Sequence, residues 1–191
     1  MKSPLFTLLS GIVPLSEAFE KALTAEVIPL SLPSRYMLLE SPKVSDHAYY
    51  IESGYIMTYT FFKGKKQVEG FFGPGQILFS PLSFFAQVPS KEFFQAMSSV
   101  ELLCVSFKST QQLLSNYHEA NQIQRALMLQ YFERERERMH DSVQLHTAER
   151  HEKLLRRFPW IEQVIPQESI ASYLGVTPQT LSRIKKEGSR R

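Results

Sequence analysis

The polar side chains best suited to a chemical role lie close together near the C-terminus of this 191-residue chain. Gln179 and Arg183 are four residues apart, so they share one face if the segment is helical. An arginine can bind O6 and N7 of guanine together, and a glutamine can bind N6 and N7 of adenine. The pair is therefore predicted to read base edges in the major groove of DNA.

Neighbouring polar side chains suit contacts to phosphates, which position a protein on DNA without specifying a sequence. They are Thr177, Thr180, Ser182, Lys185 and Lys186. Residues 175–191 carry five Lys or Arg and one Glu, a net charge of +4. The alternative interpretation is a helical hairpin whose basic face is merely solvated.

The residues around this polar set have the spacing of a helix-turn-helix. Apolar residues occupy the fourth, eighth, tenth, fifteenth and eighteenth positions of 167–186, and they are Ile170, Leu174, Val176, Leu181 and Ile184. The fifth position holds Ala171, which is small enough for a second helix to cross closely. Gly175 is expected to end the first helix with a positive φ. Thr177 is expected to cap the second helix, with Pro178 at its first position.

A long helix is predicted over residues 121–146, which contain neither Pro nor Gly. Apolar side chains recur there at four- and seven-residue spacings, and they are Met128, Phe132, Met139 and Val143. A stripe of this length needs a partner, so these residues are predicted to form the interface of a homodimer. The alternative is a helix that lies along its own domain.

Residues 27–107 read as short strands separated by turns. Aromatic and β-branched segments at 36–39, 48–51, 55–62, 68–72 and 102–107 alternate with Gly, Pro and Ser. This pattern predicts an antiparallel sandwich or barrel. Its many phenylalanines are interpreted as core residues.

Composition excludes several other classes of protein. The single cysteine, Cys104, excludes a disulfide framework and an all-cysteine metal site, and it fits a reducing, cytoplasmic compartment. No apolar run is long enough to span a bilayer. The sequence contains no nucleophile-elbow or Walker motif, and its five histidines show no ligand spacing. We therefore expect neither an enzyme nor a bound metal or cofactor.

Residues 166–184 resemble the DNA-binding end of the Crp/Fnr (cyclic-AMP-receptor-like) transcription regulators, especially their short-tailed Bacteroidetes form. The segments Tyr50-Ile51-Glu52-Ser53-Gly54 and Gly73-Pro74-Gly75-Gln76-Ile77 resemble parts of the family's β-roll. The resemblance covers nearly the whole chain.

It implies an α+β fold in three parts. These are a β-roll like a cyclic-nucleotide-binding jelly roll over 1–120, a dimerisation helix over 121–146, and a helix-turn-helix domain over 147–191. The wing of that domain is expected to be truncated, since few residues follow the second helix.

The family's nucleotide cassette has Gly-Glu-Leu, then an Arg that neutralises the cyclic phosphate. Here Phe79 stands where Gly is expected, and Ser80 stands where Glu is expected. Lys91 lies near the Arg position but cannot grip a phosphate with two parallel bonds as Arg does. The cassette is therefore interpreted as degenerate, and control by cyclic AMP is not expected.

These observations predict a sequence-specific transcription regulator that binds a pseudo-palindromic DNA site as a homodimer. The expected partners are duplex DNA and a second copy of the chain, with RNA polymerase and an unidentified small-molecule effector as further candidates. The alternative is a signalling or scaffold module whose β-roll binds a non-nucleotide ligand or a protein without specific DNA reading.

Overall fold

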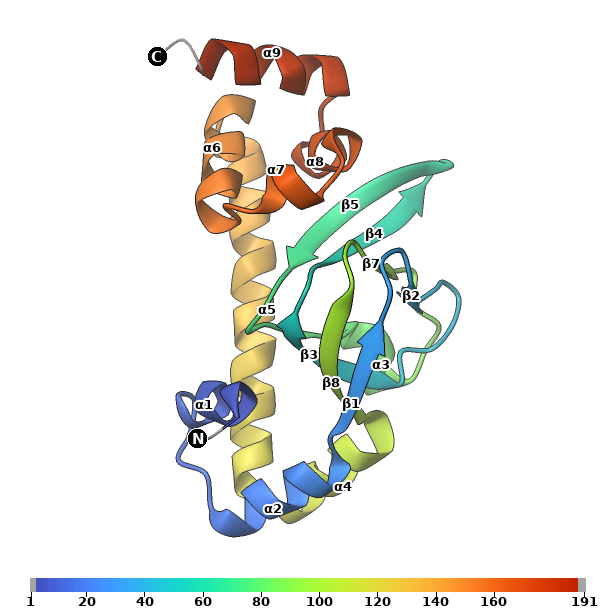
Figure 1. Cartoon of the computed structure of the whole chain (residues 1–191), viewed down its shortest axis with the longest axis vertical. Helices are drawn as coiled ribbons and strands as arrows, with labels where there is room; N and C mark the ends of the chain where they lie inside the picture. The colour runs from blue at the N-terminus through green and yellow to red at the C-terminus, as the bar shows by residue number, and fades with distance from the viewer. Residues whose placement is uncertain (1–2, 189–191) are drawn as a thin grey trace.

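A long helix forms the spine of the molecule. The structure is a computed structural model that describes residues 3–188. Helix α5 (His118–Gln144) runs along the long axis, with the strands beside it (Figure 1). The first helices of the chain lie near one end of α5, and the last helices lie at the other end.

Within residues 3–188 the strands form two antiparallel sheets of four strands each. In spatial order, the first sheet consists of β1 (Ile28–Leu32), β8 (Val100–Ser106), β3 (His47–Ser53) and β6 (Ile77–Leu78). The second consists of β2 (Met37–Leu39), β7 (Phe93–Ala96), β4 (Ile56–Phe62) and β5 (Lys65–Phe72). The inner faces of the two sheets enclose a core that includes Ile51, Ile56 and Phe94, all fully buried. The predicted antiparallel β-roll is confirmed.

Four helices cover the outer face of the first sheet. They are α1 (Pro4–Ser10), α2 (Glu17–Glu26), α4 (Phe107–Asn116) and the first turns of α5. Leu5, Leu9, Phe19 and Leu23 are buried in the cluster that these helices form with the sheet. A further short helix, α3 (Pro81–Ala86), follows β6.

The long helix was expected over 121–146, but it begins at His118 and ends at Gln144. The C-terminal difference has a local cause. His146 is the N-cap of the next helix, α6 (Thr147–Arg157), and its backbone N–H donates to Glu149 Oε2 at 2.8 Å. This reciprocal cap holds His146 in an extended conformation, which is incompatible with continuation of α5.

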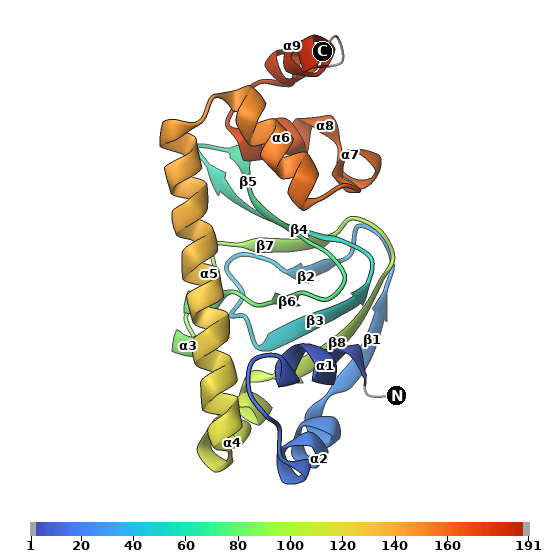
Figure 2. The ribbon, with the colours of Figure 1, turned by 90° about the vertical axis from the view of Figure 1, so that its left-hand side faces the viewer.

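The C-terminal helices pack on the β4–β5 hairpin. After α6 come α7 (Ile161–Val164), α8 (Gln167–Leu174) and α9 (Pro178–Gly188). Figure 2 shows α6, α7 and α8 above the strands, with α9 beyond them. Hairpin residues Met57 and Phe71 share one buried cluster with Phe158 and Ile161. The rings of Tyr55 and Trp160 stack with centroids 3.9 Å apart. The hairpin therefore supports the helix-turn-helix directly.

Candidate nucleic-acid interface

The turn between α8 and α9 is built as the sequence predicts. Gly175 follows α8 with φ +69°. Its N–H donates a hydrogen bond to the carbonyl of Ser172, and the N–H of Val176 donates one to the carbonyl of Ala171. These bonds satisfy carbonyls at the end of the helix. Ala171 is completely buried, as a close helix crossing requires.

The start of α9 is fixed by a side-chain cap. The Thr177 hydroxyl accepts a hydrogen bond of 3.2 Å from the backbone N–H of Thr180, and Pro178 is the first residue of the helix. The predicted cap is therefore confirmed. The hydroxyls of Thr177 and Thr180 also lie 3.0 Å apart, so each has a partner within the turn.

Helix α9 buries one face and presents the other to solvent. Leu181 is completely buried, and Ile184 is partly buried one turn later. Gln179, Arg183 and Lys186 are exposed. Figure 1 shows α9 at the extreme end of the molecule, across the line of α5. The proposed base-reading side chains therefore lie on a capped helix at one end of the molecule.

The side chain of Lys185 is partly buried, whereas those of Arg183 and Lys186 on the same helix are exposed. The ammonium group of Lys185 is 2.8 Å from Glu162 Oε1, on α7. The same carboxylate oxygen lies 3.3 Å from Nε2 of the buried His151. Burial raises the pKa of Glu162, but hydrogen bonds and charge from Lys185 and His151 outweigh it and hold the pKa below its usual value. The carboxylate thus anchors α9 to the body of the domain.

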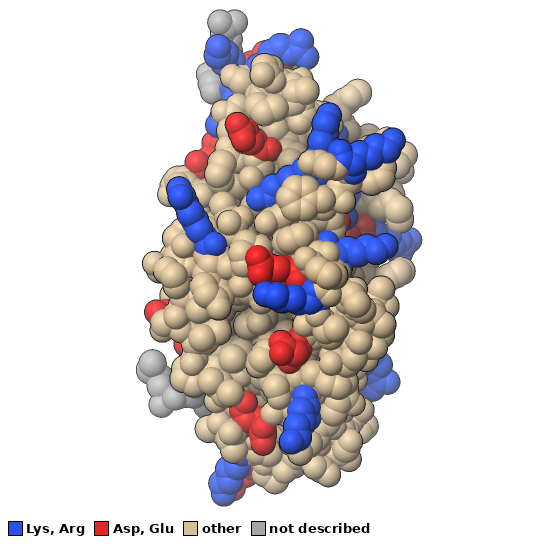
Figure 3. Space-filling model, turned by 90° about the vertical axis from the view of Figure 1, so that its right-hand side faces the viewer, with Lys and Arg blue, Asp and Glu red and all other residues tan. Residues whose placement is uncertain are grey.

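Basic side chains extend beyond α9. On the face in Figure 3, Lys and Arg gather over the upper part of the molecule, where Figure 1 places the hairpin tip and C-terminal helices. The tip residues Lys63 and Lys65 are exposed beside two exposed rings, Phe61 and Phe62. From the sequence this tip was predicted only to be a turn.

The apolar stripe of α5 is largely exposed in the single chain. The relative exposures of Phe132, Met139 and Val143 are 63%, 66% and 82%. Met128 is partly buried, while Leu129, which is not among the predicted interface residues, is 56% exposed. The first half of α5 instead packs on its own domain through residues such as Ile123. The alternative, a helix that lies along its own domain, therefore describes the first half of α5, and the dimer interface of the second half stays a prediction.

The segment predicted to be a degenerate cassette holds a compact cluster of polar side chains. Ser80 Oγ donates to a carboxylate oxygen of Glu92 and lies 3.4 Å from Ser90 Oγ. Burial raises the pKa of Glu92, and the hydrogen bond from Ser80 opposes this. Lys91 is exposed, whereas Ser90 beside it is buried. Phe79 packs its ring against Phe85 at 5.7 Å between centroids.

Little space remains between this cluster and α5. The cavity there measures about 20 Å³, and Phe72, Phe79, Tyr131 and Arg134 line it together with Glu92. The Arg134 guanidinium lies 4.2 Å from the centroid of the Phe72 ring. Glu92 and Arg134 were not predicted from the sequence, because no local spacing connects the residue before β7 with the middle of α5.

Between residues 3 and 188, no group of three His, Cys, Asp or Glu side chains is placed to hold a metal ion. Cys104 is buried, and burial raises the pKa of its thiol. No helix in the same range combines the length and apolarity needed to cross a bilayer.

Comparison with solved structures identifies the fold. The CLP protein of Xanthomonas campestris, described as a c-di-GMP-responsive global regulator, matches with a TM-score of 0.70 and 16% identity over 92% of each chain. FixK2 from Bradyrhizobium japonicum matches with a TM-score of 0.73 and 15% identity, over 84% of this chain and 83% of that one. A transcriptional regulator assigned to the Crp/Fnr family in Eubacterium rectale matches with a TM-score of 0.70 and 14% identity, over 91% and 83%.

The resemblance to the Crp/Fnr architecture is thus confirmed for the fold, from the β-roll through the long helix to the helix-turn-helix. No protein-family model matches the sequence, and a search of curated proteins returns no match. The expected truncation of the wing concerns residues 189–191, which lie outside the described part of the chain.

Proposed function

We propose that this chain is a Crp/Fnr-like transcription regulator that binds a pseudo-palindromic DNA site as a homodimer. The observation that carries the proposal is the presentation of α9. This helix lies at the end of the molecule, is capped by Thr177, and exposes Gln179, Arg183 and Lys186. Such a second helix is the element that enters the major groove in helix-turn-helix proteins.

The side chains of α9 divide into two roles. Gln179 and Arg183 would contact base edges, because both offer bidentate hydrogen bonding. The flanking set would contact phosphates, and it consists of Thr177, Thr180, Ser182, Lys185 and Lys186. Lys185 would reach a phosphate only by leaving Glu162, so its contribution would be smaller than that of the exposed Lys186.

The dimer would form through the second half of α5. An exposed stripe of Phe132, Met139 and Val143 on one long helix suits packing against the same stripe of a second copy. A two-fold axis there would place two copies of α9 on half-sites about one helical turn apart. In this proposal, RNA polymerase is the machinery whose access to a promoter the bound dimer changes.

Control by cyclic AMP is not part of the proposal. The partly buried Glu92 carboxyl, bonded to Ser80, disfavours a phosphate in the cassette region, and the cavity there is far smaller than a nucleotide. Lys91 points to solvent and cannot compensate for the missing Arg. We infer that the roll works either without an effector or with one of different chemistry.

Duplex binding by the whole chain tests the α9 assignment. Fluorescence anisotropy should reveal an affinity that falls steeply as salt rises from about 50 to about 200 mM. A triple variant, Gln179→Ala with Arg183→Ala and Lys186→Ala, should bind poorly. The control, Lys21→Ala with Lys108→Ala and Gln112→Ala, removes the same charge from exposed sites on α2 and α4 and should bind like the wild type. Equal binding by both variants would instead favour a signalling or scaffold module.

Sedimentation equilibrium tests the dimer. Phe132→Glu with Met139→Glu should shift the chain to monomers, because four charges would meet in one apolar interface. Leu82→Glu with Val88→Glu adds the same charge at exposed positions outside α5 and should leave the dimer intact. A wild-type chain that sediments as a monomer would refute this part of the proposal.

A further inference from the structure

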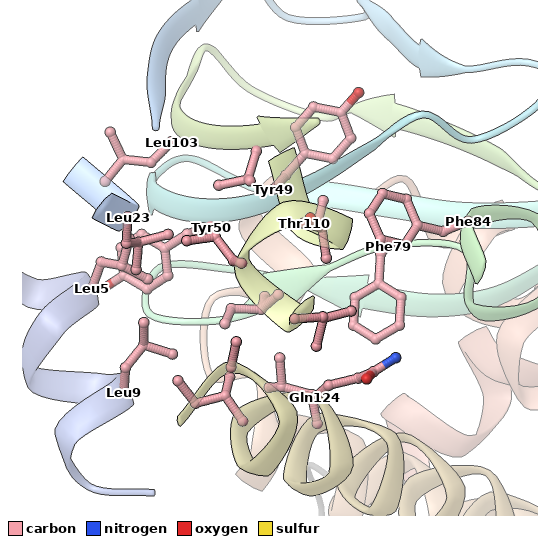
Figure 4. A pocket seen from close by; sticks show the side chains of 18 of the residues that line it. Leu5, Leu9, Leu23, Tyr49, Tyr50, Phe79, Phe84, Leu103, Thr110 and Gln124 are labelled. Carbon is pink, nitrogen blue, oxygen red and sulfur yellow. The ribbon is translucent and has the colours of Figure 1, made fainter. Parts of the chain in front are cut away.

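An apolar cavity of about 130 Å³ lies between the outer face of the first sheet and the helices that cover it (Figure 4). In this view Leu5 and Leu9 of α1 lie on one side, and Phe79 and Phe84 lie on the opposite side. Gln124 of α5 lies below them, with its amide directed toward Phe79. Elements distant in the sequence therefore meet around one space.

This cavity is separate from the cassette region. Of the residues that line it, only Phe79 also lines the small space beside Glu92. Its sheet residues include Leu103 and Val105, which face the helices, whereas Leu102 and Cys104 face the interior of the roll. A molecule bound here would occupy the opposite side of the first sheet from the roll interior.

The lining of the cavity defines the chemistry it can accept. Within residues 3–188, no charged side chain lines it, so a charged ligand would lose its hydration without gaining a counter-charge. Besides the hydroxyl-bearing Tyr49 and Tyr50, Thr110 and Gln124 contribute side-chain polar groups, and neither Thr110 nor Gln124 forms a side-chain hydrogen bond with another described residue. One polar group on a ligand could therefore find a partner that the protein itself does not supply.

The size of the cavity limits the ligand to about one ring. Protein interiors are close-packed, and an unfilled apolar space of this size costs stability. An apolar cavity of about 150 Å³ accommodates benzene. The present volume, with an amide at its edge, suits a single aromatic ring or a short branched chain with one hydroxyl or carbonyl group.

We propose that this cavity is a binding site for a neutral, largely apolar small molecule about the size of one aromatic ring, whose single polar group bonds the Gln124 amide. One wall of the site lies on α5 and consists of Ala120, Ile123 and Leu127. Another part of the wall is Ile77, which lies on β6. A bound ring would therefore favour the arrangement in which these elements close around it. Any effect on DNA rests on the proposed function, but binding itself does not.

The site can be tested without DNA, by NMR titration of the whole chain with methyl groups labelled. Toluene and p-cresol are the neutral probes, and benzoate is the charged control. Saturable shifts are expected for Leu113 and Ile123 methyl groups with both neutral probes, and none with benzoate. Because these methyl groups line the cavity, the wild-type protein alone locates the site.

Two variants sharpen the test. Gln124→Leu should weaken p-cresol binding by about fivefold while sparing toluene, because only p-cresol loses a hydrogen bond. Gln112→Leu, on the exposed face of α4, should change neither affinity. Ala120→Phe should fill the cavity and abolish both affinities in a chain that still melts cooperatively. The absence of saturable shifts at Leu113 and Ile123, or equally tight binding of benzoate, would overturn the proposal whatever the outcome of the DNA experiments.

Discussion

The hydroxyl of Ser172 donates a hydrogen bond of 2.9 Å to the backbone carbonyl of Lys66, which ties α8 to strand β5. The same hydroxyl accepts a bond of 3.1 Å from the N–H of Val68. One side chain on the first helix of the helix-turn-helix therefore satisfies two backbone groups of the hairpin. The orientation of α8, and of α9 that packs on it, is coupled to the roll at this point.

Ser172→Ala should loosen the coupling between hairpin and helix. It would leave the Lys66 carbonyl and the Val68 N–H without their partner, at a cost of about 1–3 kcal/mol. Hydrogen exchange should accelerate at Val68 while strands β3 and β8 keep their protection. Ser169→Ala, a partly buried serine on the same helix, is the matched control. Unchanged exchange at Val68 would mean that packing alone holds the hairpin in place.

Gly175→Ala should destabilise the chain through backbone strain alone. Its φ of +69° disfavours any side chain, yet a Cβ there would meet nothing within 4 Å. We expect a loss of about 1 kcal/mol in the free energy of unfolding. Gly175→Asn should lose less, because asparagine tolerates this conformation better. Chemical denaturation compares the three chains, and equal stability of all three would refute the assigned role of the turn.

Arg183→Ala and Lys186→Ala should separate specificity from general affinity. Arg183→Ala should relax discrimination at one base pair by about 1–3 kcal/mol, because a bidentate base contact is lost. Lys186→Ala should weaken all sequences alike and reduce the dependence of affinity on salt. Competition binding with a panel of single-base variants of the site measures both effects. Uniform loss in both variants would contradict the division of roles along α9.

The contact between Glu162 and Lys185 should make stability depend on pH. The folded pKa of Glu162 is held below its unfolded value, so its stabilising contribution is complete above the unfolded pKa of about 4.3. That contribution is lost as pH falls through the folded pKa, because the carboxylate takes up a proton and its attraction for Lys185 disappears.

Thermal melting of the wild type and of Glu162→Gln measures this contribution. The two melting temperatures should differ by a constant amount above about pH 5 and should converge as the pH is lowered through the folded pKa. A difference that persists undiminished in acid would show that the charge of Glu162 does not stabilise α9.

The helix-turn-helix was predictable because its signals are local. Gly175, Thr177 and Pro178 each act through the backbone of their immediate neighbours, and the structure has them in the expected conformations. The two-residue strand β6 was missed, because its pairing with Tyr49 and Tyr50 is decided by partners far away in the sequence. A local sequence pattern cannot specify a strand of two residues.

The environment of individual side chains was less predictable. Nothing in the sequence connects Glu162 to Lys185, or Ser80 to Glu92, because the fold brings each pair together. The cavity above Gln124 is likewise a property of how α1, α4 and α5 meet the sheet. The residue types predicted which surface should contact DNA. They did not predict that Lys185 on this surface would form an ion pair with Glu162.

Selection from a random duplex library tests the central claim most directly. The purified wild-type chain, at near-physiological salt and without an added effector, should enrich sequences with two inverted half-sites about one helical turn apart. Parallel selection with Arg183→Ala should retain the spacing but lose preference at one position in each half-site. Recovery of sequences without a shared motif, held only by salt-sensitive binding, would contradict the claim that α9 reads DNA as part of a two-fold dimer.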